Sequence, residues 1–233
     1  MISLVYSYYE NGGMLDRHLA EWQRYPDLIK PEFRIVVVDD GSPKDRAEKH
    51  LREVGIPIEL YRIHENIPWN VPGARNLGMN MASTKWCLLT DIDHLLPVKS
   101  AERLAARMPA LKNNCAYVLG RRWADGRELY PHGNTYILEK AVYWACGGTN
   151  EDFSGVWGAG EGQFRRHLKR RVAIVDLPDI VLNHFGRDDI ADASTRDWGR
   201  RGSKWDHSRD SVFQASVSPS PRNPFRFSWE RIV

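Results

Sequence analysis

The sequence predicts an α/β fold in which a mainly parallel sheet is flanked by helices, in a single domain with a C-terminal extension. Three observations support this fold class. Strand-like apolar runs alternate with segments of helical periodicity over residues 2–91. Two of these runs, VVVDDGS and LLTDID, end in acidic residues. The 233 residues are 42% hydrophobic, which is enough to bury one substantial core.

The first part of the chain alternates regularly between strands and helices. We expect strands over residues 2–8, 33–41, 57–63 and 85–91, with helices over residues 13–29, 43–54 and 72–82. The strand at 33–41 is a continuous apolar run, as expected where helices cover both faces of a sheet. A helix between two strands makes a crossover connection, so these strands should be parallel.

The second part is less regular. We expect a helix over 99–112, strands over 115–121 and 132–140, a Gly-rich loop running into a basic helix over 146–171, and a strand, RVAIVDLP, leading to LNHFGR at 182–187. Beyond residue 187 the chain is charged and aromatic, and residues 216–224 have the composition of a linker. The domain is therefore expected over residues 1–187, followed by a partly irregular extension over residues 188–233.

Composition and charge limit the functional classes. Lys and Arg number 33 against 30 for Asp and Glu, and the resulting net charge of +3 is too small to indicate a nucleic-acid partner. No apolar run approaches the roughly 20 residues that span a bilayer, and residues 1–9 lack signal-peptide features. The three cysteines have no CxxC spacing, so neither disulfides nor a zinc cluster is indicated. We therefore expect a cytoplasmic protein without a membrane span.

Acidic residues follow two of the predicted parallel strands. Asp39 and Asp40 end one strand, and Asp91 and Asp93 end another about fifty residues later. Ligands of such sheets bind at the carboxyl ends of the strands. Two carboxylates around one residue can converge on a divalent cation, and oxygen ligands suit Mg²⁺ or Mn²⁺. The two pairs therefore suit a nucleotide diphosphate, although acids after strands also commonly cap helices.

Six segments in order carry a resemblance to a known family. SLVYSYYENGGML, VVVDDGS, GARNLGM, LLTDID, GGTNEDF and GVWGAGEGQF resemble the motifs of GT-A fold glycosyltransferases of the family-two type, over roughly residues 1–187. The resemblance implies transfer of a sugar from a nucleotide diphosphate, with a UDP-sugar expected, to a hydroxyl acceptor. It also implies a nucleotide-sugar-binding half over residues 1–97 and an acceptor-binding half over residues 98–187.

The resemblance assigns roles on the donor side. It implies that Asp39 contacts the nucleobase, with Asp40 beside it, and that Arg75 lies near the nucleotide. Asp93 is the implied metal ligand, and Asp91 meets the ribose or assists the metal. In NHF, His184 is the candidate third ligand, and imidazole beside carboxylate suits Mn²⁺ somewhat better than Mg²⁺.

Aromatic and histidine residues near the predicted strand ends are further candidates. Tyr8 ends the first strand near the expected nucleobase site and is a candidate to pack on the base. Trp69 and Asn70 stand where they could line the nucleotide pocket, although an aromatic between two prolines can equally anchor a loop. His132 stands directly before the strand GNTYILEK, near the expected acceptor.

The chain departs from the family pattern at the catalytic base. Gly162 stands where inverting members carry the aspartate that removes the acceptor proton, so Glu161 is the acid left in that loop. Glu161 can be the base, with its pKa raised beside Trp157. Alternatively the enzyme is retaining, or Asp152 or Glu151 takes the role, or Glu161 only caps a helix. Inversion is slightly favoured.

Alternatives remain both for the acceptor and for the reaction class. Residues 196–209 interleave basic residues with tryptophans, which suits a saccharide acceptor, with a hydroxylated DNA base or a protein side chain as the minority hypothesis. LLTDIDHLL also resembles the strand-end motif of haloacid-dehalogenase-type phosphatases. That alternative leaves VVVDDGS and GVWGAGEGQF unexplained. Gly162 keeps a third alternative, a non-catalytic sugar-nucleotide-binding module.

Overall fold

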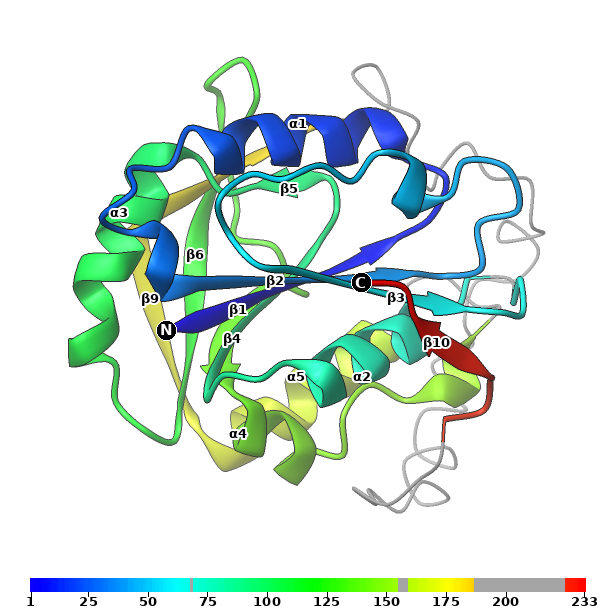
Figure 1. The fold of residues 1–233 in the computed structure, drawn as a ribbon. Coiled ribbons are helices and arrows are strands. Elements are labelled where there is room, and N and C mark those ends of the chain that lie inside the picture. Colours follow the sequence, from blue (N-terminus) through cyan, green and yellow to red (C-terminus); the bar gives the residue numbers. More distant parts are fainter. Residues whose placement is uncertain (68, 155–158, 187–224) are drawn as a thin grey trace.

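One ten-stranded sheet organises the molecule. The structure is a computed structural model that describes residues 1–67, 69–154, 159–186 and 225–233, with no side-chain placement for residues 159–161. In the described part of the chain the strand order is β10-β3-β2-β1-β4-β8-β6-β9-β5, with β7 pairing to β6 (Figure 1). The strands are β1 (Ile2–Tyr8), β2 (Phe33–Asp39), β3 (Ile58–Ile63), β4 (Trp86–Asp91), β5 (His94–Leu95), β6 (Cys115–Trp123), β7 (Glu128–Leu129), β8 (Tyr136–Glu139), β9 (Ala173–His184) and β10 (Trp229–Arg231).

Helices cover both faces of this sheet. They are α1 (Gly12–Gln23), α2 (Val71–Met81), α3 (Val98–Arg107), α4 (Lys140–Ala145) and α5 (Ala159–Arg171), with short 3₁₀ turns η1 (Lys30–Glu32), η2 (Ala47–Lys49), η3 (Met108–Ala110) and η4 (Glu151–Phe153). In Figure 1, α1 lies above the sheet and α2, α4 and α5 lie below it. None of the described helices is long and apolar enough to cross a bilayer.

Alternation along the strands divides the core into two layers. In β1, Leu4 and Tyr6 pack with α1 and α3, whereas Val5 packs with α2 and α4 on the other face. The neighbouring strand β2 alternates in the same way, so every residue of its apolar run is used. Both layers are fully buried over β1 and β2, which fixes the register of the central strands.

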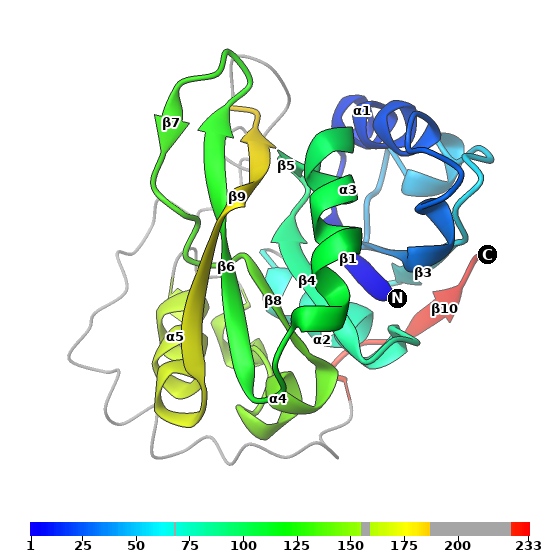
Figure 2. The same ribbon diagram turned by 90° about the vertical axis from the view of Figure 1, so that its left-hand side faces the viewer.

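The central strands are parallel and the flanking ones are mixed. β3, β2, β1 and β4 run parallel, while β8 and β10 pair antiparallel to their neighbours. Figure 2 shows β6, β7 and β9 side by side at the end of the sheet away from β10. The predicted α/β class, with a parallel core flanked by helices, is confirmed.

Two predicted helices are shorter than the sequence indicated. The helix expected over 13–29 ends at Gln23, because Pro26 lacks an N–H and disfavours helix at the residue before it. The helix expected over 99–112 ends at Arg107 and continues only as a 3₁₀ turn that contains Pro109. Proline, rather than the hydrophobic pattern, sets both ends.

The helix expected over 43–54 is wrong except for the turn η2. The carboxylate of Asp39 accepts hydrogen bonds from the backbone N–H groups of Ser42 and Ala47, each at 2.9 Å. The carboxylate of Asp45 accepts one from the N–H of Gly12 in α1. These contacts with neighbouring segments hold residues 40–47 in an open loop, because the Asp39 oxygens take the place of helical carbonyls as acceptors.

Three differences concern the second part of the chain. The strand expected over 132–140 is limited to β8 (Tyr136–Glu139), after which α4 begins. Parts of RVAIVDLP and LNHFGR join in one strand, β9, which spans Ala173–His184 and whose register against β6 shifts between Leu119 and Gly120. The extension, expected to be partly irregular, ends in a regular strand, because β10 pairs antiparallel with β3. Residues 196–209 and 216–224 lie outside the described residues.

Candidate donor and metal site

Strand register brings the two acidic pairs to one edge. β1 lies between β2 and β4, and Tyr8 is opposite Asp39 while Ser7 is opposite Asp91. Strands in a sheet are about 4.8 Å apart, so the carboxyl ends of β2 and β4 lie roughly 10 Å apart across β1. The predicted meeting of the two pairs at one sheet edge is confirmed.

The turn after β4 meets the end of β9. Asp91 ends β4, Asp93 lies in the turn, and β5 begins at His94, which is directly opposite His184 in an antiparallel pair. The carbonyl of Asp93 accepts a hydrogen bond from the N–H of Phe185 at 2.9 Å. Backbone pairing between distant segments therefore brings Asp93, His94 and His184 together, as the sequence predicted for Asp93 and His184.

The side chains of this turn form a tight acid and histidine cluster. Nδ1 of His94 lies 2.6 Å from Oδ1 of Asp93, and Nδ1 of His184 lies 3.6 Å from Oδ2 of the same carboxylate. The rings of His94 and His184 stack with centroids 4.8 Å apart. His94 is completely buried, yet neither of its ring nitrogens makes a hydrogen bond within the described residues.

Asp91 faces a buried cation and a second histidine. Arg75, buried on α2, forms an ion pair with Oδ1 of Asp91, and Nδ1 of His132 lies 3.5 Å from Oδ2. Burial raises the pKa of the Asp91 carboxyl, but Arg75, with His132 and His94, outweighs burial and holds that pKa well below its usual range. Asp91 is therefore ionised at neutral pH.

Two of the histidines are neutral at pH 7. Burial lowers the pKa of His132 to about 4 and that of His184 to about 4, despite the opposing pull of Asp91 and Asp93. A neutral imidazole keeps a lone pair for a metal ion. Burial also lowers the pKa of Arg121 in β6, although the two carboxylates oppose that shift. A guanidinium remains cationic near neutral pH.

The donor atoms of this cluster fit a divalent cation. Two groups, Asp91 with His94 and His132, and Asp93 with His94 and His184, each place their ligand atoms within 4.8 Å of one another. Oxygen and imidazole nitrogen together suit first-row divalent cations. Asp93 and His184, the predicted ligands, belong to one group, and Asp91 belongs to the other.

The nucleoside-side residues are held tightly by their own loop. Asp39 is 1% exposed, and both of its oxygens accept backbone hydrogen bonds from the loop that follows β2. Burial raises the pKa of Asp39 more than these hydrogen bonds lower it. Tyr8 is also buried, and its hydroxyl donates to the carbonyl of Asp45 at 2.6 Å. Asp39 and Tyr8 thus shape this loop, and their predicted contacts with a nucleobase stay predictions.

Hydrogen bonds through Asn70 join the loop after β2 to the loop before α5. The side-chain amide of Asn70 donates to Oδ1 of Asp40 at 3.1 Å, and its oxygen accepts from the hydroxyl of Ser154 at 2.8 Å. Trp69 beside it is buried, with a left-handed φ of 48°. Asn70 therefore ties Asp40 to the loop before α5, and Trp69 is buried beside it.

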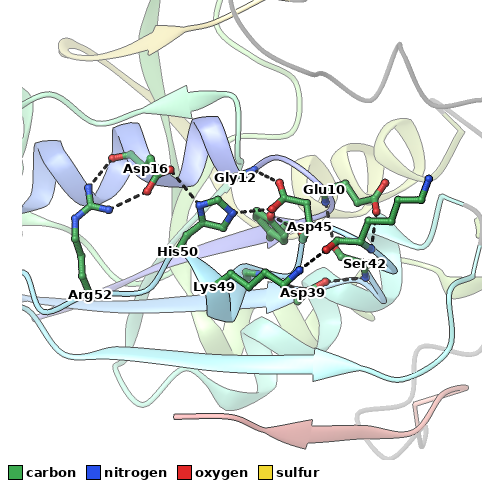
Figure 3. Close-up of polar contacts among 12 residues, drawn as sticks. Glu10, Gly12, Asp16, Asp39, Ser42, Asp45, Lys49, His50 and Arg52 are labelled. Carbon is green, nitrogen blue, oxygen red and sulfur yellow. Dashed lines mark hydrogen bonds and ion pairs between the residues drawn. The ribbon is translucent and has the colours of Figure 1, made fainter.

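A separate histidine cluster fastens the loop after β2 to α1. Figure 3 shows His50 between two carboxylates, with Nε2 2.7 Å from Oδ1 of Asp45 and Nδ1 3.0 Å from Oδ2 of Asp16. Arg52 donates to the other oxygen of Asp16 at 2.8 Å. A side chain on Gly12 would meet the His50 ring at 2.1 Å, so the close approach requires glycine.

The acceptor-side acids lie in η4, which α2 holds in place. The side chain of Asn76 donates both to the carbonyl of Thr149 and to Oε1 of Glu151, each at 2.8 Å. Asp152 forms an ion pair with Arg226, whose N–H also donates to Oε2 of Glu151. Both acids of this turn are therefore engaged by other residues.

The proposed catalytic loop is only partly described. The backbone of Glu161 belongs to α5, but its side chain lies outside the described part of the structure. Trp157 also lies outside the described residues. The roles predicted for Glu161 and Trp157 therefore stay predictions.

The structure adds three residues to the predicted set. His94 follows the acidic pair directly, and that adjacency was the available signal for it. His18, on α1, contacts the carbonyl of Ile92 at 2.8 Å through Nε2 and so supports the turn after β4. Arg121 faces both carboxylates from β6. No sequence pattern marks His18 or Arg121, because their partners lie far along the chain.

Comparisons with solved structures agree with this architecture. The chain resembles S. aureus TarS in complex with UDP, with a TM-score of 0.60, 17% identity, and coverage of 78% of this chain and 59% of that one. A mannosyltransferase from Pyrobaculum calidifontis, solved with GDP-Man and Mn²⁺, gives a TM-score of 0.59 at 17% identity and covers 78% and 56%. GalNAc-T7, solved with UDP, GalNAc and Mn²⁺, gives 0.58 at 15% and covers 79% and 43%.

These likenesses concern the fold, which is GT-A-like. The chain spans less than two thirds of the length of each of these solved structures. No curated protein sequence matches it. The sequence profile described as "Glycosyl transferase family 2" matches residues 4–174, which is most of the chain. The chain therefore belongs to glycosyl transferase family 2.

Proposed function

We propose that this protein is a metal-dependent glycosyltransferase that moves a sugar from a nucleotide diphosphate, a UDP-sugar, to a hydroxyl of a saccharide acceptor. The observation that carries the proposal is the cluster of Asp91, Asp93 and His184 at the same sheet edge as Asp39 and Asp40. Family membership supports the reaction class. Among the fold relatives, TarS was solved with UDP-GlcNAc and two others with Mn²⁺, which supports the donor and cofactor.

The charges of the cluster support a diphosphate ligand. Asp91 and Asp93 are balanced by Arg75 and Arg121, so the charge near the turn is close to zero before a metal binds. Asp93 and His184, with Asp91, would hold Mn²⁺ or Mg²⁺, and the ion would act as a Lewis acid on the departing diphosphate. A bound divalent cation makes the site positive, which suits an anionic diphosphate.

The protein groups around the cluster orient the donor. Arg75 keeps Asp91 ionised and fixes one of its oxygens, which leaves the other facing the site. Asp39 holds the loop after β2 in the shape against which a uracil base would bind. Tyr8 and Asp40 complete this side, because both are buried at the carboxyl ends of the neighbouring strands β1 and β2.

Glu161 is the base that we propose for the acceptor hydroxyl. Asp152 is paired with Arg226, and Glu151 accepts from both Asn76 and Arg226, so neither is placed to take a proton. This engagement favours Glu161 and an inverting reaction, with Trp157 expected beside the acceptor. Retention of configuration, which requires no such base, is the alternative.

The domain division follows from the same proposal. Residues 1–97 carry the donor site and residues 98–187 the acceptor side, while residues 188–233 form the extension. A cytoplasmic location and a saccharide acceptor stay predictions, with a hydroxylated DNA base or a protein side chain as the other acceptors. Family membership leaves the phosphatase alternative without support. Detectable sugar transfer, or slow hydrolysis of a sugar nucleotide, would exclude a purely binding role.

Thermal unfolding with a panel of nucleotide diphosphates, each with and without Mn²⁺, tests the proposal. A ligand at a hundred times its dissociation constant adds about 2.7 kcal/mol to stability. We expect UDP with Mn²⁺ to raise the midpoint well above GDP with Mn²⁺ or UDP alone. A folded sample whose midpoint moves with no nucleotide would contradict the donor site, and an equal rise without metal would contradict metal dependence.

A further inference from the structure

Two histidines at the donor edge have no role in the proposed reaction. His94 is completely buried, and His132 lies in the loop before β8, with its ring centroid 4.6 Å from that of His94. Neither nitrogen of His94 and not Nδ1 of His132 makes a hydrogen bond within the described residues. The Nδ1 atom of His184 shares this condition.

Burying these unsatisfied ring nitrogens together destabilises the fold unless a ligand binds them. Buried polar groups are normally hydrogen-bonded, because an unsatisfied group loses its hydrogen bonds to water and gains none in return. His18, also completely buried, has one ring nitrogen, Nε2, in contact with the carbonyl of Ile92, whereas neither nitrogen of His94 has a hydrogen-bond partner within the described residues. Three adjacent imidazoles with unsatisfied nitrogens are therefore expected to have a common ligand.

The surrounding charges indicate that this ligand is a cation. Carboxylate oxygens of Asp91 and Asp93 face the histidine nitrogens at 3.5 and 3.6 Å. Two ligands about 2.1 Å from one ion at a tetrahedral angle lie about 3.4 Å apart, close to both distances. An anion at these nitrogens would face the same carboxylates and be repelled.

We propose that His94 and His132 are ligands of the metal centre, which is therefore rich in imidazole and prefers a late first-row cation to Mg²⁺. The inference rests on the proposed function, because it completes the metal site of that reaction. Asp91, His94 and His132 form one group of ligand atoms, Asp93, His94 and His184 form the other, and His94 belongs to both. Imidazole ligands favour Co²⁺, Ni²⁺ and Zn²⁺, whereas Mg²⁺ is held by oxygen ligands.

Cobalt binding to the nucleotide-free protein tests the assignment. The full chain, stripped of metal, is titrated with Co²⁺, whose visible absorption reports nitrogen ligands. We expect His132→Asn to weaken Co²⁺ binding at least tenfold and to change the spectrum. His132 is 25% exposed, so this variant should fold. His64→Asn, at a 46% exposed histidine directly after β3, is the matched control and should leave both unchanged.

The outcomes separate the inference from the proposed function. If His132→Asn binds Co²⁺ with the affinity and spectrum of the original protein, or if equimolar Mg²⁺ displaces Co²⁺, the inference is overturned. If Asp93→Asn loses Co²⁺ binding and His132→Asn does not, the metal site of the proposed function stands and His132 is not one of its ligands, which overturns the inference. Binding of Co²⁺ that depends on His132, together with no response to any nucleotide, would support the metal centre and contradict the transferase proposal.

Discussion

Two histidine clusters in this protein contain the same residue types and differ in chemistry. His50 and His94 each lie next to aspartates. Both ring nitrogens of His50 lie within hydrogen-bonding distance of carboxylates, at 2.7 and 3.0 Å. His94 is more deeply buried. Its Nδ1 lies 2.6 Å from Oδ1 of Asp93 without the geometry of a hydrogen bond, and its Nε2 has no hydrogen-bond partner within the described residues. The first cluster is satisfied by its own residues, whereas we propose that a metal ion completes the second.

The difference lies in what neutralises the acids. Burial lowers the pKa of His50, but hydrogen bonds to Asp45 and Asp16 outweigh it and raise the pKa above its usual value. The histidine thus supplies positive charge to its own acids. Near His94 the guanidinium groups of Arg75 and Arg121 supply that charge, and the pKa of the neighbouring histidines is lowered instead. We therefore expect a metal site beside acids and histidines where other cations, and not the histidines, balance the acids.

The largest effect is expected from removing charge at the ligand cluster. Asp93→Asn should lower sugar transfer by roughly a thousandfold, because Lewis-acid assistance is worth several kcal/mol. The fold should be retained, since Asp93 lies in a turn and its backbone contact with Phe185 does not involve the carboxylate. Transfer assays under limiting metal, with circular dichroism as the folding control, check this. Turnover equal to that of the original protein would sink the proposed mechanism.

The second-largest effect is expected from removing Arg75, the cation that balances Asp91. Arg75→Met should destabilise the protein by about 3–5 kcal/mol, because it leaves a largely buried carboxylate without its ion pair. Urea unfolding measures the loss. The matched double variant Arg75→Met with Asp91→Asn removes both charges and should recover much of it. Equal losses in the single and double variants would show that the ion pair does not account for the effect.

A smaller effect is expected at the cluster of His50 with Asp45 and Asp16. Gly12→Ala should cost about 1–3 kcal/mol, because the added carbon would lie 2.1 Å from the His50 ring. Gly13→Ala is the matched control, since nothing lies within 4 Å of that carbon and alanine is the better helix former. Comparison of their unfolding free energies checks the packing. A Gly12 variant as stable as the Gly13 variant would contradict the close approach.

The smallest effect is a pH dependence that the two clusters should not share. Because the pKa of His50 is raised on folding, its stabilisation is complete below pH 6.5 and is lost as the pH rises through the raised pKa. His50→Gln should therefore cost about 1 kcal/mol more at pH 6 than at pH 9. Urea unfolding of both proteins at the two pH values measures this. A difference that grows with pH would contradict the assignment.

Local patterns predicted the parallel core and the donor edge well. Apolar runs and crossovers marked β1 to β4, and strand ends located Asp39 and Asp91 at one edge. The same patterns failed for residues 43–54, where Asp39 and Asp45 bind backbone groups instead of leaving them to a helix. Hydrophobic periodicity does not report such hydrogen bonds between segments.

Contacts between distant segments limited how much of the site the sequence could predict. His132 meets Asp91 from a loop 41 residues away, and His94 meets His184 through the pairing of β5 with β9. Nothing near His132 in the sequence identifies its partner. Arg121 likewise takes its position from β6 and not from a motif. The residue types at this edge were predictable, whereas the full set of acids and histidines that gather there required the tertiary structure.

The strand β10 has a consequence for the behaviour of the protein in solution. It lies along the outer edge of β3, where Ile232 donates to the carbonyl of Leu60 and Leu60 donates to Val233. An uncovered strand edge is a template on which other chains can add strands and aggregate. Residues 225–233 therefore shield the parallel core from self-association, and a truncated chain without them would expose β3 to intermolecular pairing.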